Sequence, residues 1–327
     1  MSAVTRVVVI GGGTSSEHEV SLASAAGIAA ALDRSRFDVV ELTIRPDGSW
    51  ARADGRDVPG DLAGAIGILE RADVVIPALH GARGEDGTIA ALLDLVGVPY
   101  VGSGVAAGAL AMSKRATKAV AADAGVPGAA GFVVRDAADA RLADVPLPVV
   151  VKPDRGGSSH GVVLVEDRDD LGAAIATALA FGDEAVVEQL VRGREIDVAV
   201  IEHPDGRLEC LPPLEIVVAG GGLFDAHEKY EREPDFRIPA PLDEGVLARL
   251  NAAALSTFRA IGAQGLARID FFVSAGEVLL NEVNTFPGFT ARSQVPRMAA
   301  ARGIDYPALV ELLVTTALAR SDPHRIR

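Results

Sequence analysis

The sequence predicts an α/β protein, because short apolar strands alternate with helices along its first third. Strands are expected at 6–10, 37–44 and 73–79, and an alanine-rich helix follows the first of them up to about residue 32. The strands are apolar and rich in β-branched residues, which is typical of a parallel sheet with helices on its faces. A chain of 327 residues is too long for one compact core, so we expect two or three domains.

The middle of the chain predicts a smaller α+β unit. A turn-rich break at 99–104 is a candidate boundary, and the pattern from 106 to 124 is helical. After Pro127 the elements are short. Strands are expected at 131–134, 149–152, 162–165 and 185–188, and a helix at 171–181.

The last third combines regular elements with one long irregular stretch. Strands are expected near 195–201 and 214–218, a helix at 244–261, a hairpin with strands at 265–273 and 278–283, and a closing helix. An irregular run of this length inside a compact domain usually forms a functional lid or is disordered. The run at 219–241 carries many chemically specific side chains, so we expect a mobile functional loop. These side chains are Phe224, Asp225, His227, Lys229, Tyr230 and Arg232.

Composition excludes several classes of protein. The net charge of −14 argues against a partner such as nucleic acid or an anionic membrane, since both require a basic surface. Cys210 is the only cysteine, which rules out an intrachain disulfide and a multi-cysteine metal site. No signal peptide and no apolar run long enough to cross a bilayer is visible, so we expect a cytoplasmic protein.

The hairpin near the C-terminus carries the sharpest candidate site. Glu282 and Asn284 are two residues apart on one strand and therefore share a face, and Asp270 lies on the preceding strand within cross-strand reach. Two carboxylates and an amide oxygen form a hard site that suits Mg²⁺ with further ligands from phosphates. Arg268 would add a cation on the same face. The alternative is a polar, solvated hairpin face without a metal.

The loop KPDRGGSSHG at 152–161 is the second candidate. Its glycines allow backbone N–H groups to approach a polyphosphate, Ser158 and Ser159 add hydroxyl donors, and Lys152 supplies a charge. It is not a Walker A loop, because the lysine precedes the glycines and a strand follows them. Lys114 on the preceding helix favours the nucleotide interpretation over a plain glycine-serine hairpin.

Three weaker signals remain. The segment from Val187, with Glu188 inside it, is similar to a connector that binds adenine through backbone groups, and Glu195 would accept from ribose hydroxyls. The turn GGGTSSE at 11–17 lacks the third glycine of a dinucleotide-binding turn, and Glu17 suits a substrate ammonium group better than a pyrophosphate. His80 follows a strand at its carboxyl end, where ligands bind in such sheets, although a structural histidine is an equal alternative.

Together these motifs resemble the D-alanine–D-alanine ligases of the ATP-grasp superfamily. The resemblance runs from Gly12 to about Ala319. The segments that carry it, in the family's order, are GGTSSEHEVSLAS, ALHGARGEDGT, VPYVGSG, VVVKPDRGGSSHG, GLARIDFF and NEVNTFPGFT. It implies an ATP-grasp fold in which the nucleotide lies between a central and a C-terminal domain. The expected domains are an N-terminal substrate-binding domain at 1–104, a central one at 105–190 and a catalytic one at 191–327 with the mobile loop 219–241.

The resemblance also implies the reaction and a role for each matching residue. Two D-alanine molecules would be joined through an acyl phosphate, with ATP and two Mg²⁺ ions (or Mn²⁺), to make a peptidoglycan precursor, and the enzyme would be a homodimer. Asp270, Glu282 and Asn284 would bind the metal, and Lys114, Lys152, Ser159, Glu188 and Glu195 the nucleotide. Glu17, Ser158 and Tyr230 would close the site, Lys229 would lie by the γ-phosphate, Arg268 and Gly288 would stabilise the oxyanion, and His80 and Ser293 would bind substrate.

Two departures from the family pattern keep other acceptors open. The loop has Ala226 where the family usually has an aromatic residue, followed by His227, and D-alanine–D-lactate ligases also use a histidine in this loop. Arg292 and Gln294 flank Ser293, where smaller or apolar side chains are expected. The alternative function is therefore a paralogous ligase for a different amino or hydroxy acid. A nucleotide-binding regulator or NAD-dependent oxidoreductase would rest on the first glycine turn alone.

Overall fold

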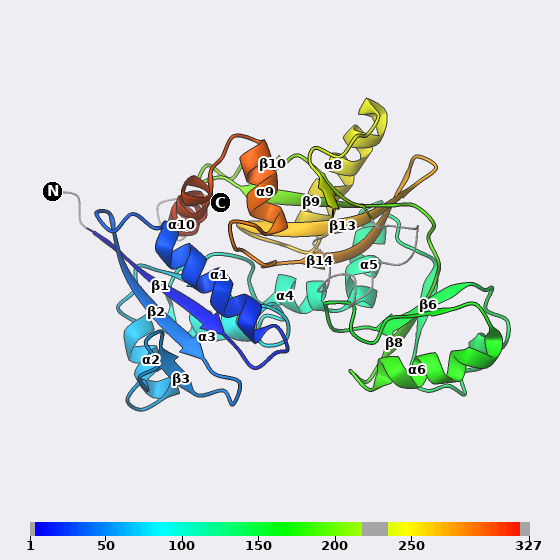
Figure 1. Ribbon diagram of the computed structural model, residues 1–327, viewed down its shortest axis with the longest axis horizontal. Coiled ribbons are helices and arrows are strands. Elements are labelled where there is room, and N and C mark those ends of the chain that lie inside the picture. The colour runs from blue at the N-terminus through cyan, green and yellow to red at the C-terminus, as the bar shows by residue number, and fades with distance from the viewer. Residues whose placement is uncertain (1–3, 218–234, 321–327) are drawn as a thin grey trace.

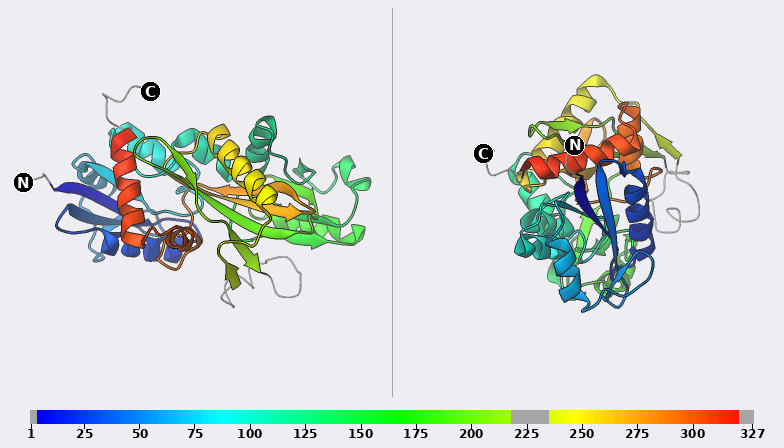
Figure 2. Two further views of the ribbon diagram at one scale, coloured as in Figure 1. Left: turned by 90° about the horizontal axis from the view of Figure 1, so that it is seen from above. Right: turned by 90° about the vertical axis from the view of Figure 1, so that its left-hand side faces the viewer.

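The computed structural model describes residues 4–217 and 235–320, which form three sheets with helices packed around them (Figure 1). The views in Figure 2 show an elongated molecule with the small sheet at the end opposite the N-terminal sheet. Most of the expected loop 219–241, including Lys229 and Tyr230, lies outside the described residues. Among the described residues, no helix is long and apolar enough to span a membrane.

The N-terminal sheet has the predicted parallel arrangement. Its elements are β1 (Thr5–Gly12), α1 (His18–Ala31), β2 (Phe37–Ile44), β3 (Trp50–Arg52), α2 (Leu62–Leu69), β4 (Val74–Pro77) and α3 (Thr88–Val96). The strand order is β3-β2-β1-β4, and β1 pairs in parallel with β2 and β4. Side chains of β1 alternate between two cores: Val7 and Val9 pack with α1, while Val8 and Ile10 pack with α2 and α3. This two-sided burial explains why the strand sequence is apolar throughout.

The small sheet forms the outer wall of the site. Its elements are β5 (Gly131–Val134), β6 (Val149–Pro153), β7 (Val163–Val165), α6 (Leu171–Leu179) and β8 (Ala185–Gln189). The strand order is β5-β8-β6-β7, all antiparallel. Val149 and Val151 of β6 belong to the core under α6. Because side chains alternate along a strand, Val150 and Lys152 face the other way, toward the large sheet.

The large sheet and its helices make up the rest of the described chain. The elements are β9 (Arg194–Glu202), β10 (Leu208–Cys210), β11 (Leu214–Val217), β12 (Asp235–Arg237), α8 (Glu244–Ala260), β13 (Leu266–Ser274), β14 (Glu277–Asn284), α9 (Gln294–Ala301) and α10 (Tyr306–Arg320). The order is β12-β11-β9-β13-β14, with β10 paired to β9. One face packs on α8, whereas Ala199 and Ile201 on the other face join α9, α10 and the N-terminal sheet in one core.

Two differences from the expected elements concern the middle and end of the chain. The single helix expected at 106–124 is wrong: the structure has α4 (Val105–Met112) and α5 (Lys114–Asp123), separated by Ser113. Ser113 is extended and caps α5, since its Oγ accepts from the Ala116 amide at 3.1 Å. Both helices pack against β14 of the large sheet. The expected irregular run also ends early, because β12 pairs with β11. The domain limits at 104 and 190 remain predictions.

Candidate functional site

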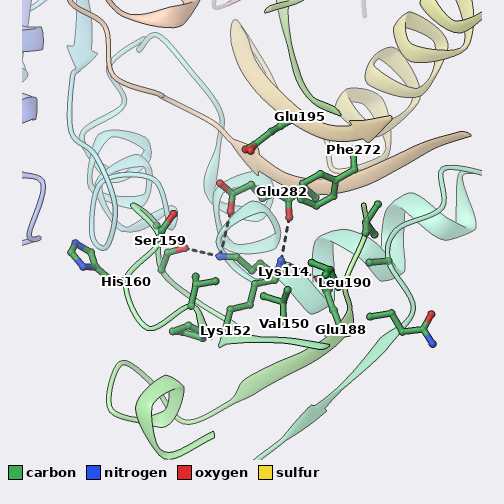
Figure 3. A pocket seen from close by; sticks show the side chains of 18 residues that line it. Lys114, Val150, Lys152, Ser159, His160, Glu188, Leu190, Glu195, Phe272 and Glu282 are labelled. Carbon is green, nitrogen blue, oxygen red and sulfur yellow. Dashed lines mark hydrogen bonds and ion pairs between the residues drawn. The ribbon is translucent and has the colours of Figure 1, made fainter. Parts of the chain in front are cut away.

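The principal pocket lies between the small sheet and the β13–β14 hairpin (Figure 3). One part of its wall is apolar, formed by side chains such as Val150, Leu190 and Phe272. Another part carries the ammonium groups of Lys114 and Lys152 beside Gly156 and Gly157. A pocket with an apolar wall and a cationic, glycine-lined wall suits a ligand that has a flat base and a polyphosphate.

The glycine-serine loop is anchored by Asp154, to which the sequence patterns assigned no role. The Asp154 carboxylate accepts from the Ser113 hydroxyl at 2.7 Å and from the Arg115 amide at 2.8 Å, which ties the loop to the start of α5. Ser158 and Ser159 both have positive φ, at 54° and 56°. A non-glycine residue adopts this conformation at a cost, so two in succession indicate a loop shaped for a ligand.

The two predicted phosphate-binding lysines point into the pocket and are engaged by protein groups. Lys114 donates to the Gly156 carbonyl at 2.7 Å, and its Nζ lies 3.5 Å from the Glu282 carboxylate. Lys152 lies 3.0 Å from Glu188 and donates to the Asn281 side chain at 3.1 Å. Both ammonium groups therefore sit where a phosphate could replace a protein partner.

Lys118 is a further cation that the sequence argument did not single out. It lies one turn after Lys114 on α5, so the two lysines share a helix face, and this spacing of four was the available signal. Its Nζ donates to Glu188. Burial opposes the charge of Glu188, but Lys152 and Lys118 hold the pKa of its carboxyl below the usual range. Burial lowers the pKa of Lys118 to about 8, with a further contribution from Lys152.

The acidic hairpin has the geometry that its spacing predicts. Asp270 is paired directly with Glu282, and Arg268 with Asn284, before a bulge after Asp270 shifts the register. Arg268 makes a bidentate contact with Asp270, with Nε and Nη2 each 2.7 Å from a carboxylate oxygen. Burial opposes the charge of Arg268, but Asp270 and Asp197 raise its pKa above the ordinary value.

The donor set of this hairpin fits Mg²⁺. Asn284 donates through Nδ2 to Asp270 at 3.0 Å, which leaves its amide oxygen as the group that can face a cation. Among the described residues, no three histidine, cysteine or acidic side chains group closely enough to hold a metal. Two carboxylates and an amide oxygen are ligands that suit Mg²⁺, an ion that usually keeps several waters and takes further ligands from phosphates.

A second pocket adjoins the first and contains Glu17 and Ser158. The Ser158 hydroxyl donates to the Glu17 carboxylate at 2.9 Å, although 141 residues separate them. The two pockets have four lining residues in common, Lys114, Gly156, Gly157 and Glu282. A group held in the second pocket could therefore reach the phosphate end of the first across one shared wall.

Glu85 is a further acidic residue of the second pocket, and the sequence patterns did not indicate it. The residue is only partly buried, but its carboxylate is enclosed and accepts from the amides of Gly81 and Phe286, at 2.9 and 3.1 Å. Burial raises its pKa to about 7, and the nearby charge of Glu17 adds to this effect. Glu85 joins the loop after β4 to the turn after β14. Sequence alone gives no signal for a contact across 201 residues.

His80, Ser293 and Gly288 lie beside the site but do not line either pocket. His80 contacts the Phe286 carbonyl through Nδ1 at 2.8 Å and the Ser24 hydroxyl through Nε2 at 3.0 Å. Burial lowers its pKa, which fits this structural use of both nitrogens. Ser293 accepts from the Thr290 amide at 3.0 Å. The substrate-binding roles of His80 and Ser293 remain predictions.

The other expected nucleotide residues line the first pocket. Glu195 on β9 lies opposite Phe272 of β13, and Ser159 lies in the glycine-serine loop. Glu188 is 5% exposed and faces the pocket from β8. The structure thus brings together every described residue of the expected nucleotide and metal sets, and their roles remain predictions.

Comparison with known proteins gives the family. The sequence matches the family models described as "D-ala D-ala ligase N-terminus", over residues 6–63 and 61–103, and "D-ala D-ala ligase C-terminus", over residues 133–315. The chain belongs to the D-alanine–D-alanine ligase family. A D-alanine–D-alanine ligase of Mycolicibacterium smegmatis is 44% identical over an alignment that covers 97% of this chain and 96% of the relative.

Solved structures of the ligase family have the same fold. A D-alanine–D-alanine ligase from Bacillus anthracis, complexed with ATP, aligns with a TM-score of 0.82 at 28% identity and covers 98% of this chain and 100% of its own. The VanG D-Ala:D-Ser ligase from Enterococcus faecalis aligns with a TM-score of 0.83 at 29% identity and covers 96% and 100%. These matches confirm the predicted ATP-grasp fold, and the family confirms the predicted enzyme class, an ATP-dependent ligase.

Proposed function

We propose that this ligase joins two D-alanine molecules into D-alanyl-D-alanine through an acyl phosphate, for peptidoglycan precursor synthesis. The observation that carries the proposal is the wall shared by the two pockets, with Lys114, Gly156, Gly157 and Glu282. An amino acid in one pocket and a triphosphate in the other would meet at this wall. Curated D-alanine–D-alanine ligases at 42–44% identity support the same substrate.

The first D-alanine would bind in the second pocket. Its ammonium group would lie by Glu17, which Ser158 holds in place through the 2.9 Å hydrogen bond. Its carboxylate would then point to the shared wall and attack the γ-phosphorus of ATP, which breaks the bond to the bridging oxygen and releases ADP. A carboxylate is a poor electrophile, so this step converts it into an acyl phosphate, and catalysis is mostly positioning and charge neutralisation.

ATP would occupy the first pocket. Lys114 and Lys152 would contact the α- and β-phosphates, Ser159 would donate from the loop, and Glu188 and Glu195 would bind the base and the ribose. Lys229, outside the described residues, is proposed beside the γ-phosphate. We propose that Asp270, Glu282 and Asn284 hold two Mg²⁺ ions (or Mn²⁺). When bound, these ions would supply neutralisation of the phosphate charge.

The amine of the second D-alanine would attack the carbonyl carbon of the acyl phosphate and displace inorganic phosphate. The developing oxyanion needs preorganised donors, and Arg268 with the Gly288 amide would provide them. Arg268 is suited to this role because Asp270 fixes the orientation of its guanidinium through Nε and Nη2. Tyr230 and the loop 219–241, which lie mostly outside the described residues, are proposed to close the site and exclude water.

The assembly and location are also proposals. Because ATP is the co-substrate, we place the reaction in the cytoplasm. The family resemblance implies a homodimer. No nucleic acid or membrane partner is proposed, and the strongly negative net charge supports this.

A different acceptor is the alternative, since the VanG structure belongs to a D-Ala:D-Ser ligase and Arg292 and Gln294 flank Ser293 here. The test is purified protein with ATP, Mg²⁺ and D-alanine, followed by phosphate release and product mass. D-Serine, D-lactate and other amino acids are supplied as second acceptors. D-Alanyl-D-alanine as the main product supports the proposal. Phosphate release that requires another acceptor would refute it.

A further inference from the structure

Lys118 is a partly buried lysine that contacts the nucleotide pocket only indirectly. Its side chain is 13% exposed and does not line the pocket. Its stem packs over Gly128, where a Cβ would lie only 3.2 Å from Lys118 Cδ. Its ammonium group donates to Glu188, whose carboxylate does line the pocket. Lys118 therefore binds the Glu188 carboxylate from outside the pocket.

Glu188 is shared between two cations, one on each carboxylate oxygen. Lys118 contacts Oε1, and Lys152 lies 3.0 Å from Oε2. The two lysines differ in position: Lys152 lines the pocket beside the glycine-serine loop, whereas Lys118 does not. An incoming phosphate can reach the first of them and not the second.

Phosphate binding would compete with Glu188 for Lys152. A buried carboxylate that loses its cation is strongly destabilised, so the exchange is unfavourable unless another cation remains. Lys118 is that remaining cation. With it in place, Glu188 stays an ionised group that only accepts hydrogen bonds, which suits the amino group of a 6-aminopurine and disfavours the carbonyl of a 6-oxopurine.

We propose that Lys118 is a positioning residue for the nucleotide, which retains the Glu188 carboxylate at the purine while Lys152 is released to the phosphates. The inference rests on the proposed function, because it takes Lys152 as a phosphate ligand. If it is right, this one lysine determines both the affinity of the site for the phosphates and its preference for a 6-aminopurine base.

The environment of Lys118 predicts that the affinity for ADP depends on pH. The pKa of this lysine is lowered to about 8, mainly by burial and also by the charges of Lys152 and Lys114, while Glu188 opposes the shift. Transfer of Lys152 to a phosphate would remove one of these cations and favour the protonated form of Lys118. The affinity for ADP should therefore fall as the pH rises above about 8.

The experiment measures binding of Mg²⁺-ADP by calorimetry, without D-alanine. Lys118→Met should raise the Kd for ADP by about tenfold or more, because Glu188 then retains Lys152, while Lys118→Arg should restore most of the affinity. The double variant Lys118→Met with Glu188→Gln should also recover affinity, since a neutral glutamine no longer competes for Lys152. Arg115→Met removes an exposed cation from the same helix and is the matched control.

Two results would overturn the inference: a Lys118→Met variant that binds ADP as the wild type does, or a double variant as weak as Lys118→Met alone. If Lys118→Met does not fold, Lys118→Gln takes its place, because glutamine keeps a polar side chain but carries no charge: it should also raise the Kd for ADP and weaken the preference for ATP over GTP. A Lys118→Gln variant with the wild-type Kd and the wild-type preference would refute the role. A wild-type protein that binds no ADP would instead contradict the proposed function.

Discussion

The carboxyl group of Glu85 gives a prediction about stability and pH. Its pKa is raised from 4.5 to about 7 by burial. The folded protein therefore binds more protons than the unfolded chain between these pH values, and the free energy of unfolding falls as the pH rises through this range. A pKa shift of one unit corresponds to about 1.4 kcal/mol. Ionisation of Glu85 should therefore lower the free energy of unfolding by on the order of 3 kcal/mol at neutral and higher pH.

The variant Glu85→Gln isolates this contribution, because glutamine does not titrate. At pH 5 the variant should be less stable than the wild type, since an amide NH₂ would face one of the two backbone donors, Gly81 and Phe286. Between pH 5 and pH 8 the free energy of unfolding of the variant should increase relative to that of the wild type by up to about 3 kcal/mol.

The assay is urea unfolding of both proteins across this pH range, without nucleotide. The enclosed carboxylate should be screened weakly, so the same change is expected at high salt. If the free energies of unfolding of the two proteins change by the same amount from pH 5 to pH 8, the pKa of Glu85 is not raised, and the account of this carboxylate is wrong.

Three further predictions concern turnover. Ser158→Ala removes the hydrogen bond to Glu17 and should lower kcat/KM for D-alanine, measured as phosphate release, about tenfold to a hundredfold. An unchanged value would mean that this hydrogen bond does not contribute to turnover. Asp270→Ala or Glu282→Ala should reduce turnover by at least about a hundredfold with an unchanged circular dichroism spectrum, and persistent activity would exclude them as metal ligands. Tyr230→Phe should shift acceptor choice and its pH dependence, and identical kinetics with D-alanine would remove Tyr230 from the site.

Sequence patterns located the site where it depends on local geometry. The trio of Asp270, Glu282 and Asn284 follows from the two-residue period of a strand, and the pairing of Asp270 with Glu282 confirms the predicted juxtaposition. The glycine-serine loop was likewise visible from composition. The three-residue strands β3, β10 and β12 were not predicted, because three residues are too few to show a period; β7 is equally short but was predicted, since the apolar run 162–165 directly follows the glycine-serine loop.

The missed residues depend on tertiary contacts. Lys118 becomes informative only once its helix packs near β8 and Glu188, and Glu85 only once two distant loops meet. The division of the expected helix at Ser113 has the same origin. Ser113 donates to Asp154, 41 residues away, and this contact competes with an uninterrupted helix.

The most direct test is a crystal structure of the protein with ADP, Mg²⁺ and a phosphinate analogue of the dipeptide intermediate. The account predicts that the phosphates lie between the glycine-serine loop and the β13–β14 hairpin, with metal ions bound to Asp270, Glu282 and Asn284. A nucleotide bound elsewhere, or an acidic trio without any metal ion, would contradict it.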